Sequence, residues 1–200
     1  MTRSSDTKER LITGALELVS ERSYANVGVQ ELCEYAGAKK GSFYYFFKSK
    51  QDLMLKALEH QAQAMNNMIL MPAFSSKLAP LKRIEQMFNL TYQYQKSIKE
   101  KTGRVGGCFF GNLALELSTQ DELIRHRLDI IFNRQLKLIK QCLEEAVTAG
   151  HLSEIDIQLT AEAILAYWEG TILFSKVRNE PEMLKSLAKG VRELVIKKPK

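Results

Sequence analysis

The chain has 200 residues, 45% of them hydrophobic, and a formal net charge of +6. This length and apolar content allow a substantial core and exclude the disordered and fibrous classes of protein. No apolar run approaches the roughly 20 residues that span a bilayer, and residues 1–6 are polar, without a signal-peptide apolar region. The three cysteines lack metal-ligand spacing, and their odd number predicts reduced thiols. We therefore expect a cytoplasmic protein without disulfides, metal sites, cofactors or membrane partners.

The first predicted helix opens with Asp6-x-x-Glu9, a pattern typical of a capping box. Its apolar residues fall on one stripe: Leu11, Ile12, Ala15, Leu18 and Val19. A single apolar stripe predicts a helix that packs on one side against the core of a small domain.

The next segment predicts a helix, a tight turn and a second helix. Four apolar residues recur at helical spacing before the turn: Val29, Leu32, Cys33 and Ala36. Gly37 then supplies the permissive backbone that ends the helix. The short second helix can turn Phe43, Phe46 and Phe47 inward, with Ser42, Tyr44 and Tyr45 toward the other side. Four lysines flank it: Lys39, Lys40, Lys48 and Lys50. Such a unit suits a groove lined by phosphates.

The run from Gly41 to Leu53 resembles the signature of the TetR-type bacterial transcriptional regulators. That signature reads Gly-Thr-(apolar)-Tyr-Tyr-(x)-(aromatic)-Lys-x-Lys-x-x-Leu. Two positions differ, because the chain has Val27-Gly28 where Thr-Thr or Thr-Ser is usual, and Phe46 where His is common. The resemblance implies a three-helix, helix-turn-helix DNA-binding domain over residues 1–47. It implies an effector-binding and dimerisation domain over residues 48–200.

The remaining segments are also predicted to be helical, over about 49–68, 80–99, 108–117, 122–150, 156–174 and from 181 onward. The sequence Met71-Pro72 should break the first of these, since proline cannot continue a helix. The glycine-rich segment 102–107 is interpreted as a flexible helix junction, because no strand precedes it and no Gly-Lys-Ser/Thr follows it. No segment alternates with period two over a useful length. The predicted fold class is all-α.

Two helices near the end of the chain are expected to form the homodimer interface. Residues 156–176 are apolar on more than one face and include small residues at Ala161, Ala163, Ala166 and Gly170. The final helix carries a stripe of Leu184, Leu187, Val191 and Leu194. We expect these helices to form a four-helix bundle with a second copy, and the family resemblance implies the same pairing.

The DNA site is expected on the short second helix. The candidates near base edges are Lys40, Gly41, Ser42 and Tyr44, and the candidates for phosphate contacts are Lys39, Tyr45 and Lys50. The family's contact pattern supports these roles. The alternative is that the lysines form a solvated face and the two tyrosines are core residues. The expected partner is a palindromic double-stranded DNA operator.

Cys108 is the candidate sensing residue. It follows two glycines and should lie in the first turn of a helix, where the helix dipole favours thiolate. The segment 107–117 resembles that of the TetR subgroup typified by the repressor of N-ethylmaleimide reductase, which responds to electrophiles or oxidants. The alternative is a packed thiol, as expected for Cys33 and Cys142. Residues that could line an effector cavity, or be plain core, are Tyr92, Phe109, Asn112, Trp168 and Phe174.

Three functional hypotheses remain open from the sequence. The preferred one is a repressor released from its operator by a small-molecule or electrophilic effector. The second is a thiol-based redox switch at Cys108 without a ligand pocket. The third is an α-helical enzyme on this scaffold, which is disfavoured because no nucleophile stands with a base and the histidines His60, His126 and His151 are scattered.

Overall fold

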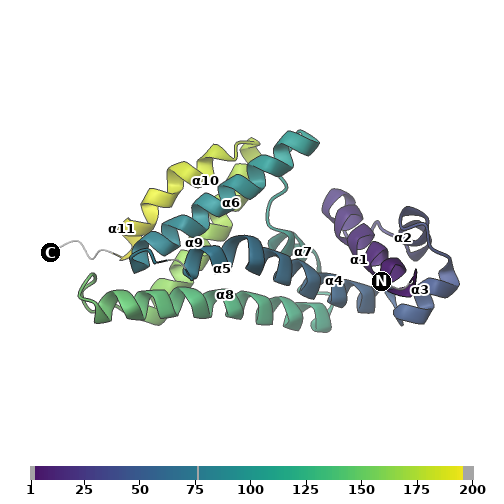
Figure 1. Ribbon diagram of the computed structural model, residues 1–200, viewed down its shortest axis with the longest axis horizontal. Coiled ribbons are helices and arrows are strands. Elements are labelled where there is room, and N and C mark those ends of the chain that lie inside the picture. Colours follow the sequence, from purple (N-terminus) through teal and green to yellow (C-terminus); the bar gives the residue numbers. More distant parts are fainter. Residues whose placement is uncertain (1–2, 76, 196–200) are drawn as a thin grey trace. The chain divides into compact units, whose positions relative to one another are not determined.

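The computed structural model describes residues 3–75 and 77–195, and in this part of the chain every regular element is a helix (Figure 1). The predicted all-α class is confirmed. The long and medium helices are α1 (Arg3–Arg22), α4 (Lys50–Met65), α6 (Pro80–Thr102), α7 (Phe109–Leu117), α8 (Glu122–Thr148) and α9 (Ile157–Arg178). The short ones are α2 (Val29–Tyr35), α3 (Lys40–Phe46), α5 (Met71–Phe74), α10 (Glu182–Leu187) and α11 (Val191–Val195). A π-helical turn, η1 (Asn66–Leu70), precedes α5, and a 3-10 turn, η2 (Ala188–Gly190), precedes α11.

The chain forms two compact units. Unit 1 comprises Met1–Ala64 and Phe109–Ile130, and unit 2 comprises Met65–Cys108 and Ile131–Lys200. These units differ from the functional division expected after residue 47, because α4 and α7 belong to unit 1. A compact unit need not coincide with a functional one, so the functional boundary remains a prediction.

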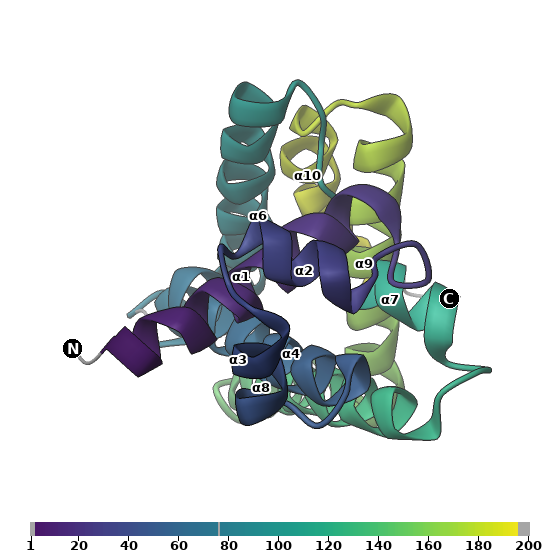
Figure 2. The ribbon, with the colours of Figure 1, turned by 90° about the vertical axis from the view of Figure 1, so that its right-hand side faces the viewer.

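Helices α1, α2 and α3 pack on one another in unit 1 (Figure 2). The predicted stripe of α1 is buried, from Leu11 to Val19, and so are Leu32 and Cys33 of α2. Phe43 and Phe47 complete this small core and are at most 1% exposed. The sequence predicted these positions correctly, because burial of one face follows directly from helical periodicity.

The helix-turn-helix break lies where the sequence placed it. Gly37 has φ of +58°, in the left-handed region that glycine adopts readily. The N–H of Ala38 donates to the carbonyl of Cys33 at 2.8 Å, and the Arg10 Nε donates to the carbonyl of Ala36 at 2.9 Å. These bonds satisfy carbonyls at the end of α2 and fix the direction in which α3 leaves.

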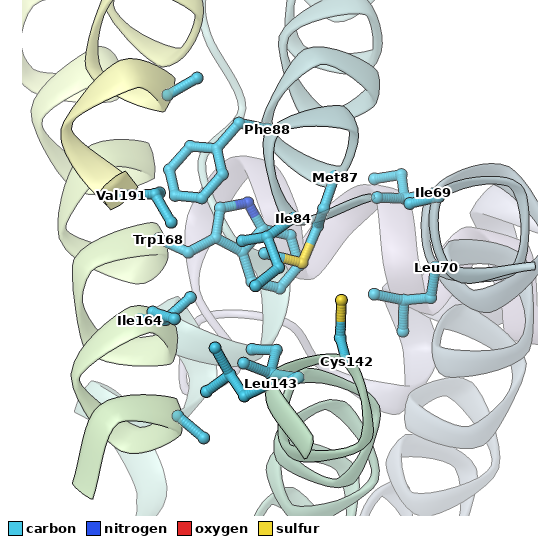
Figure 3. Packing of buried hydrophobic residues seen from close by; sticks show 14 of the residues in the cluster. Ile69, Leu70, Ile84, Met87, Phe88, Cys142, Leu143, Ile164, Trp168 and Val191 are labelled. Atoms are coloured by element: carbon cyan, nitrogen blue, oxygen red, sulfur yellow. The ribbon is translucent and has the colours of Figure 1, made fainter. Parts of the chain in front are cut away.

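The core of unit 2 gathers around Trp168, with Ile84, Met87 and Phe88 of α6 beside it (Figure 3). Leu184, Val191 and Val195 belong to the same buried cluster. The expectation that the last helix presents Leu184 and Val191 to a second subunit is therefore wrong, because the chain's own core covers that face.

Several predicted helix limits also need correction. Pro72 does not break the helical path, since it lies in the first turn of α5, where its missing N–H has no helical role. Helix α6 continues to Thr102 and α9 to Arg178, each ended by a residue in the left-handed conformation, Gly103 and Asn179. Helix α7 begins at Phe109, so Cys108 immediately precedes it.

Candidate DNA interface and effector region

Helix α3 buries Phe43 and exposes its tyrosines, whereas Phe46, which was also expected to face inward, is only partly buried. Phe43 is 0% exposed, whereas Tyr44 is 59% and Tyr45 78% exposed. The Phe43 and Tyr44 rings meet edge to face, with centroids 5.2 Å apart. The alternative that these tyrosines are core residues is wrong, because Phe43 and Phe47 fill the core and hold the helix with its tyrosines outward.

Four other predicted contact residues lie beside these tyrosines, of which Ser42 is only partly exposed. Lys39 precedes the first helical residue, Lys40, and both side chains are exposed, as is Gly41. A Cβ at Gly41 would meet no atom within 4 Å, so packing within the chain does not require glycine there. An open hollow of about 660 Å³ lies beside this helix, lined by Asp6, Thr7, Arg10, Gly41, Ser42, Tyr45 and Phe46.

The segment 39–50 contains four lysines and no acidic residue. Lysines near a DNA backbone contribute affinity by displacing counterions, whatever the base sequence. The polar groups on the exposed face of α3 supply donors and acceptors of the kind that read base edges in the major groove. The arrangement can therefore combine charge-based attraction with sequence reading.

Lys50 differs from the other lysines of this segment. Its Nζ donates to the carbonyls of Tyr24 and Val27, at 2.9 and 3.0 Å, and lies 4.0 Å from the centroid of the Tyr24 ring. Burial lowers the pKa of Lys50, and the nearby Glu116 carboxylate opposes that effect. The structure thus gives Lys50 partners inside unit 1, which its position in the motif did not indicate.

Glu116 is a second residue that sequence reasoning missed. Its carboxylate accepts hydrogen bonds from the backbone N–H groups of Tyr24 and Ala25, at 2.9 and 2.7 Å. Burial raises the pKa of Tyr24, and the charges of Asp121 and Glu116 raise it further. Spacing along the chain gave no signal for these contacts, because they join residues far apart in sequence.

In unit 2, Cys108 stands beside a buried carboxyl group. Its thiol is hydrogen-bonded to the side chain of Glu169 in α9. Burial raises the pKa of Glu169 to about 7, and the hydrogen bond from Cys108 acts in the opposite direction. Cys108 itself is partly exposed. The pair places a carboxylate where it can receive the thiol proton.

The glycine-rich segment before Cys108 is held by side chains, which corrects its interpretation as a flexible junction. Gln95 donates to the Gly107 carbonyl at 2.9 Å and accepts from the Gly107 N–H at 3.1 Å. Gly107 has φ of +82°, and a Cβ there would lie 2.6 Å from Cδ of Lys176. Asn179 accepts the N–H of Val105 at 2.9 Å. The positive φ favours glycine here, whereas the flexible side chain of Lys176 can move away from an added Cβ.

The predicted effector residues are divided between the units. Cys108, Tyr92 and Trp168 lie in unit 2, whereas Phe109 and Asn112 lie in unit 1. Trp168 is 1% exposed and donates from Nε1 to the Thr91 hydroxyl at 3.1 Å. It is thus a satisfied core residue. Tyr92 is partly buried, with Lys185 Nζ 5.9 Å from its ring centroid. An effector pocket remains a prediction.

The other two thiols are buried. Burial raises the pKa of Cys33, and it raises the pKa of Cys142 to about 12. The Cys142 thiol also donates to the Pro80 carbonyl at 2.8 Å. Both environments favour the neutral thiol, as expected of packing residues.

Among residues 3–75 and 77–195, no group of three or more His, Cys, Asp or Glu side chains is placed to hold a metal ion. In the same described part of the chain, no helix combines the length and apolar character needed to cross a bilayer.

Comparison with known proteins connects these features to a family. The family model described as "Bacterial regulatory proteins, tetR family" matches residues 11–57, and that described as "Tetracyclin repressor-like, C-terminal domain" matches residues 80–191. The first match covers the helix-turn-helix with its exposed lysines and tyrosines. The second covers α6 to the start of α11, which contain the core around Trp168.

Individual relatives are also transcriptional regulators. Transcriptional regulator AcuR of Cereibacter sphaeroides is 30% identical over 185 residues, which cover 90% of this chain and 81% of the relative. The repressor NemR of Escherichia coli K12 is 26% identical over 193 residues, covering 95% and 94%. The crystal structure of a regulatory protein TetR from Rhodobacter sphaeroides matches with a TM-score of 0.81 and 29% identity, over 94% of this chain and 98% of that one. The chain therefore belongs to the TetR family of bacterial DNA-binding transcriptional regulators, which are not enzymes.

Proposed function

We propose that this regulator is a homodimeric repressor that binds a palindromic double-stranded DNA operator through α3 and leaves it when an effector acts on the residues that follow residue 47. The exposed polar face of α3, supported by a buried phenylalanine core, carries this proposal. Two relatives, DhaR of Mycobacterium sp. and NemR of Escherichia coli, bear the name repressor, which supports repression over activation.

Each exposed residue of this face has a proposed role. Lys40, Gly41, Ser42 and Tyr44 approach base edges, whereas Lys39 and Tyr45 hold phosphates. For Lys50, expected from the sequence to hold a phosphate, we propose instead that it stabilises the protein beneath the DNA. Its two hydrogen bonds to the carbonyls of Tyr24 and Val27 support this change.

For the effector we favour two chemistries, a small molecule or an electrophile that reacts with Cys108. The electrophile is supported by the difference among the three thiols. Cys108 is partly exposed and faces a carboxylate that can take its proton, whereas Cys33 and Cys142 are buried. When a maleimide adds, the Cys108 sulfur bonds to one alkene carbon. The thiol proton passes to Glu169 and then to the other alkene carbon.

DNA binding is tested with genomic fragments that the purified protein retains. Sequencing those fragments should reveal a palindromic site, and binding to that site should weaken steeply as salt rises. If the retained DNA has no common sequence, the protein is not an operator-specific repressor.

The thiol hypothesis is tested on the operator complex. Brief treatment with a maleimide, followed by peptide mass spectrometry, should show modification at Cys108 before Cys33 or Cys142. The modified protein should release DNA, whereas Cys108→Ser should remain bound after the same treatment. Should Cys108→Ser release DNA as readily as the wild type, Cys108 is a packing residue and a reversible ligand becomes the preferred effector.

A further inference from the structure

The turn that joins α1 to α2, residues 23–28, depends on side chains from other elements. Its first residue, Ser23, has φ of +98°, a conformation that residues other than glycine rarely adopt. The next two backbone N–H groups, at Tyr24 and Ala25, both donate to the carboxylate of Glu116 in α7. Hydrogen bonds to a charged acceptor are stronger than those between neutral groups. Glu116 thus stabilises the turn by accepting hydrogen bonds from two of the turn's N–H groups.

Lys50 stabilises the same turn by donating hydrogen bonds to two of the turn's carbonyl groups. Its Nζ donates to the carbonyls of Tyr24 and Val27, at both ends of the turn. Lys50 is the first residue of α4, and α3 ends shortly before it in the chain. The turn is therefore hydrogen-bonded to the Lys50 ammonium group from α4 and to the Glu116 carboxylate from α7.

Two further contacts attach the segment after α7 to α4. Gln51 Nε2 donates to Asp121 Oδ2 at 2.7 Å, and Arg127 Nη1 donates to Glu59 Oε2 at 3.1 Å. The other oxygen of Asp121 accepts the N–H of Ile124 and caps α8. These two contacts attach the start of α8 to α4, in addition to the contact of Glu116 with the α1–α2 turn.

We propose that Glu116 is a positioning residue for DNA binding: its carboxylate holds the α1–α2 turn and so keeps the helix-turn-helix in the geometry that fits the operator. The inference rests on the proposed role of α3 in DNA binding. It also suggests a route for control, since α7 begins one residue after Cys108 and carries Glu116 near its end. A displacement of α7 along or about its axis removes the carboxylate from the turn.

The proposal is tested by measuring the affinity of Glu116→Ala for the retained operator fragment. Without the carboxylate, we expect the fraction of protein in the binding geometry to fall to about a tenth, which weakens affinity about tenfold. Glu116→Gln should be intermediate, because only one of its two side-chain groups can accept a hydrogen bond. The dependence of affinity on salt should stay that of the wild type, because Glu116 contacts no phosphate.

Glu21→Ala is the matched control. Glu21 lies in the same unit, on the exposed surface of α1, and its replacement removes the same charge. This variant should bind at least as tightly as the wild type, so a loss of affinity in Glu116→Ala cannot come from net charge. Hydrogen exchange at the amides of Tyr24 and Ala25 reports the turn directly, and should speed up in both Glu116 variants.

If a Glu116 variant showed fast exchange at these amides but kept the DNA affinity of the wild type, the proposal would be overturned, since release of the turn would then have no effect on binding. If Glu116→Ala does not fold, the same two measurements on Glu116→Gln decide the matter. Failure of the wild type to select any DNA sequence would instead refute the proposed function.

A last measurement concerns control by α7. Modification of the wild type at Cys108 with a maleimide should weaken DNA binding. The same modification of Glu116→Ala should lower DNA affinity by a smaller factor, because the turn is already released in that variant. If modification lowered the DNA affinity of both proteins by the same factor, α7 would not be the route by which Cys108 controls DNA binding. If the modified wild type keeps its full affinity, the electrophile hypothesis fails, while the positioning role of Glu116 is still decided by the unmodified variants.

Discussion

Lys39 and Lys50 belong to one basic segment, yet their surroundings give them different physical roles. Lys39 is exposed at the start of α3, the helix proposed to bind DNA. Lys50 is half-buried, and its ammonium group is hydrogen-bonded to two carbonyls of its own unit. A lysine with internal partners stabilises a conformation, whereas a lysine on phosphate releases counterions.

The two lysines are therefore predicted to differ in a salt titration of operator binding. Replacing Lys39 by Ala should reduce the slope of log affinity against log salt by about 1, as expected for one lost phosphate contact. Lys50→Ala should lower affinity by about five- to tenfold on every sequence, through a smaller binding-competent fraction, with little change in slope. A slope reduced equally in both variants would return Lys50 to the phosphate contacts.

Glu169 should make the stability of the protein depend on pH. Its pKa is raised by burial from 4.5 to about 7. The folded state then binds more protons than the unfolded state between these values, so stability is greatest below the lower value and falls as pH rises through the upper one. Glu169→Gln removes this titration. Between about pH 5 and pH 8, the free energy of unfolding should fall by about 1 to 3 kcal/mol more in the wild type than in the variant. Parallel urea-unfolding profiles for the two proteins would contradict the assigned shift.

At the scale of elements, α9 carries several exposed apolar side chains. Leu159, Leu173, Phe174 and Val177 are all more than half exposed. Six residues recur at alternating steps of four and three, as on a helix face that packs against another helix: Leu159, Ala163, Ala166, Gly170, Leu173 and Val177. The small residues at the centre of this face allow a second backbone to approach closely. We place the proposed homodimer contact here.

The α9 face is tested with Ala166→Glu, which puts a charge at its centre. Wild-type protein should elute at twice the chain mass of 22.8 kDa in size exclusion with light scattering. The variant should shift to monomer or aggregate, because an unpaired charge buried in an interface is costly. Ala149→Glu, at an exposed alanine outside α9, is the matched control and should remain a dimer. A dimeric Ala166→Glu protein would place the interface elsewhere.

At the scale of the whole molecule, a twofold dimer presents two copies of α3 to DNA. In helix-turn-helix dimers these helices enter successive major grooves on one side of the duplex, about 34–36 Å apart. The operator should therefore contain two inverted half-sites with centres about 10 base pairs, or a multiple of that, apart. Symmetry of the protein is thus expected to appear as symmetry of its binding site.

Operator spacing gives the corresponding prediction. Insertion of about 5 base pairs between the half-sites should turn them to opposite sides of the duplex and reduce affinity to that of a single half-site. Replacing the central base pairs without changing their number should have a much smaller effect. Competition binding with labelled fragments measures both. Undiminished binding to the lengthened operator would mean that the two half-sites are read independently.

The sequence by itself determined the local features of this protein. Apolar periodicity predicted α1 and the buried faces of α2 and α3, and Gly37 predicted the break between those helices, because each depends on residues within a few turns. The run after Gly41 predicted the exposed Tyr44 and Tyr45 of α3, whereas Phe46, expected to face inward, is only partly buried. Cys33 and Cys142 were predicted to be buried from their place on apolar stripes.

Only the tertiary structure decided which residues each local pattern contacts. A single apolar stripe shows that a helix face is covered but not by what, so Leu184 and Val191 were assigned to a partner although the chain's own core covers them. Lys50 and Glu116 meet the α1–α2 turn across long separations in sequence, and Gln95 reaches the glycines before Cys108 from another helix. These contacts depend on how distant segments pack together, and that packing satisfies backbone groups for which spacing along a single chain gives no signal.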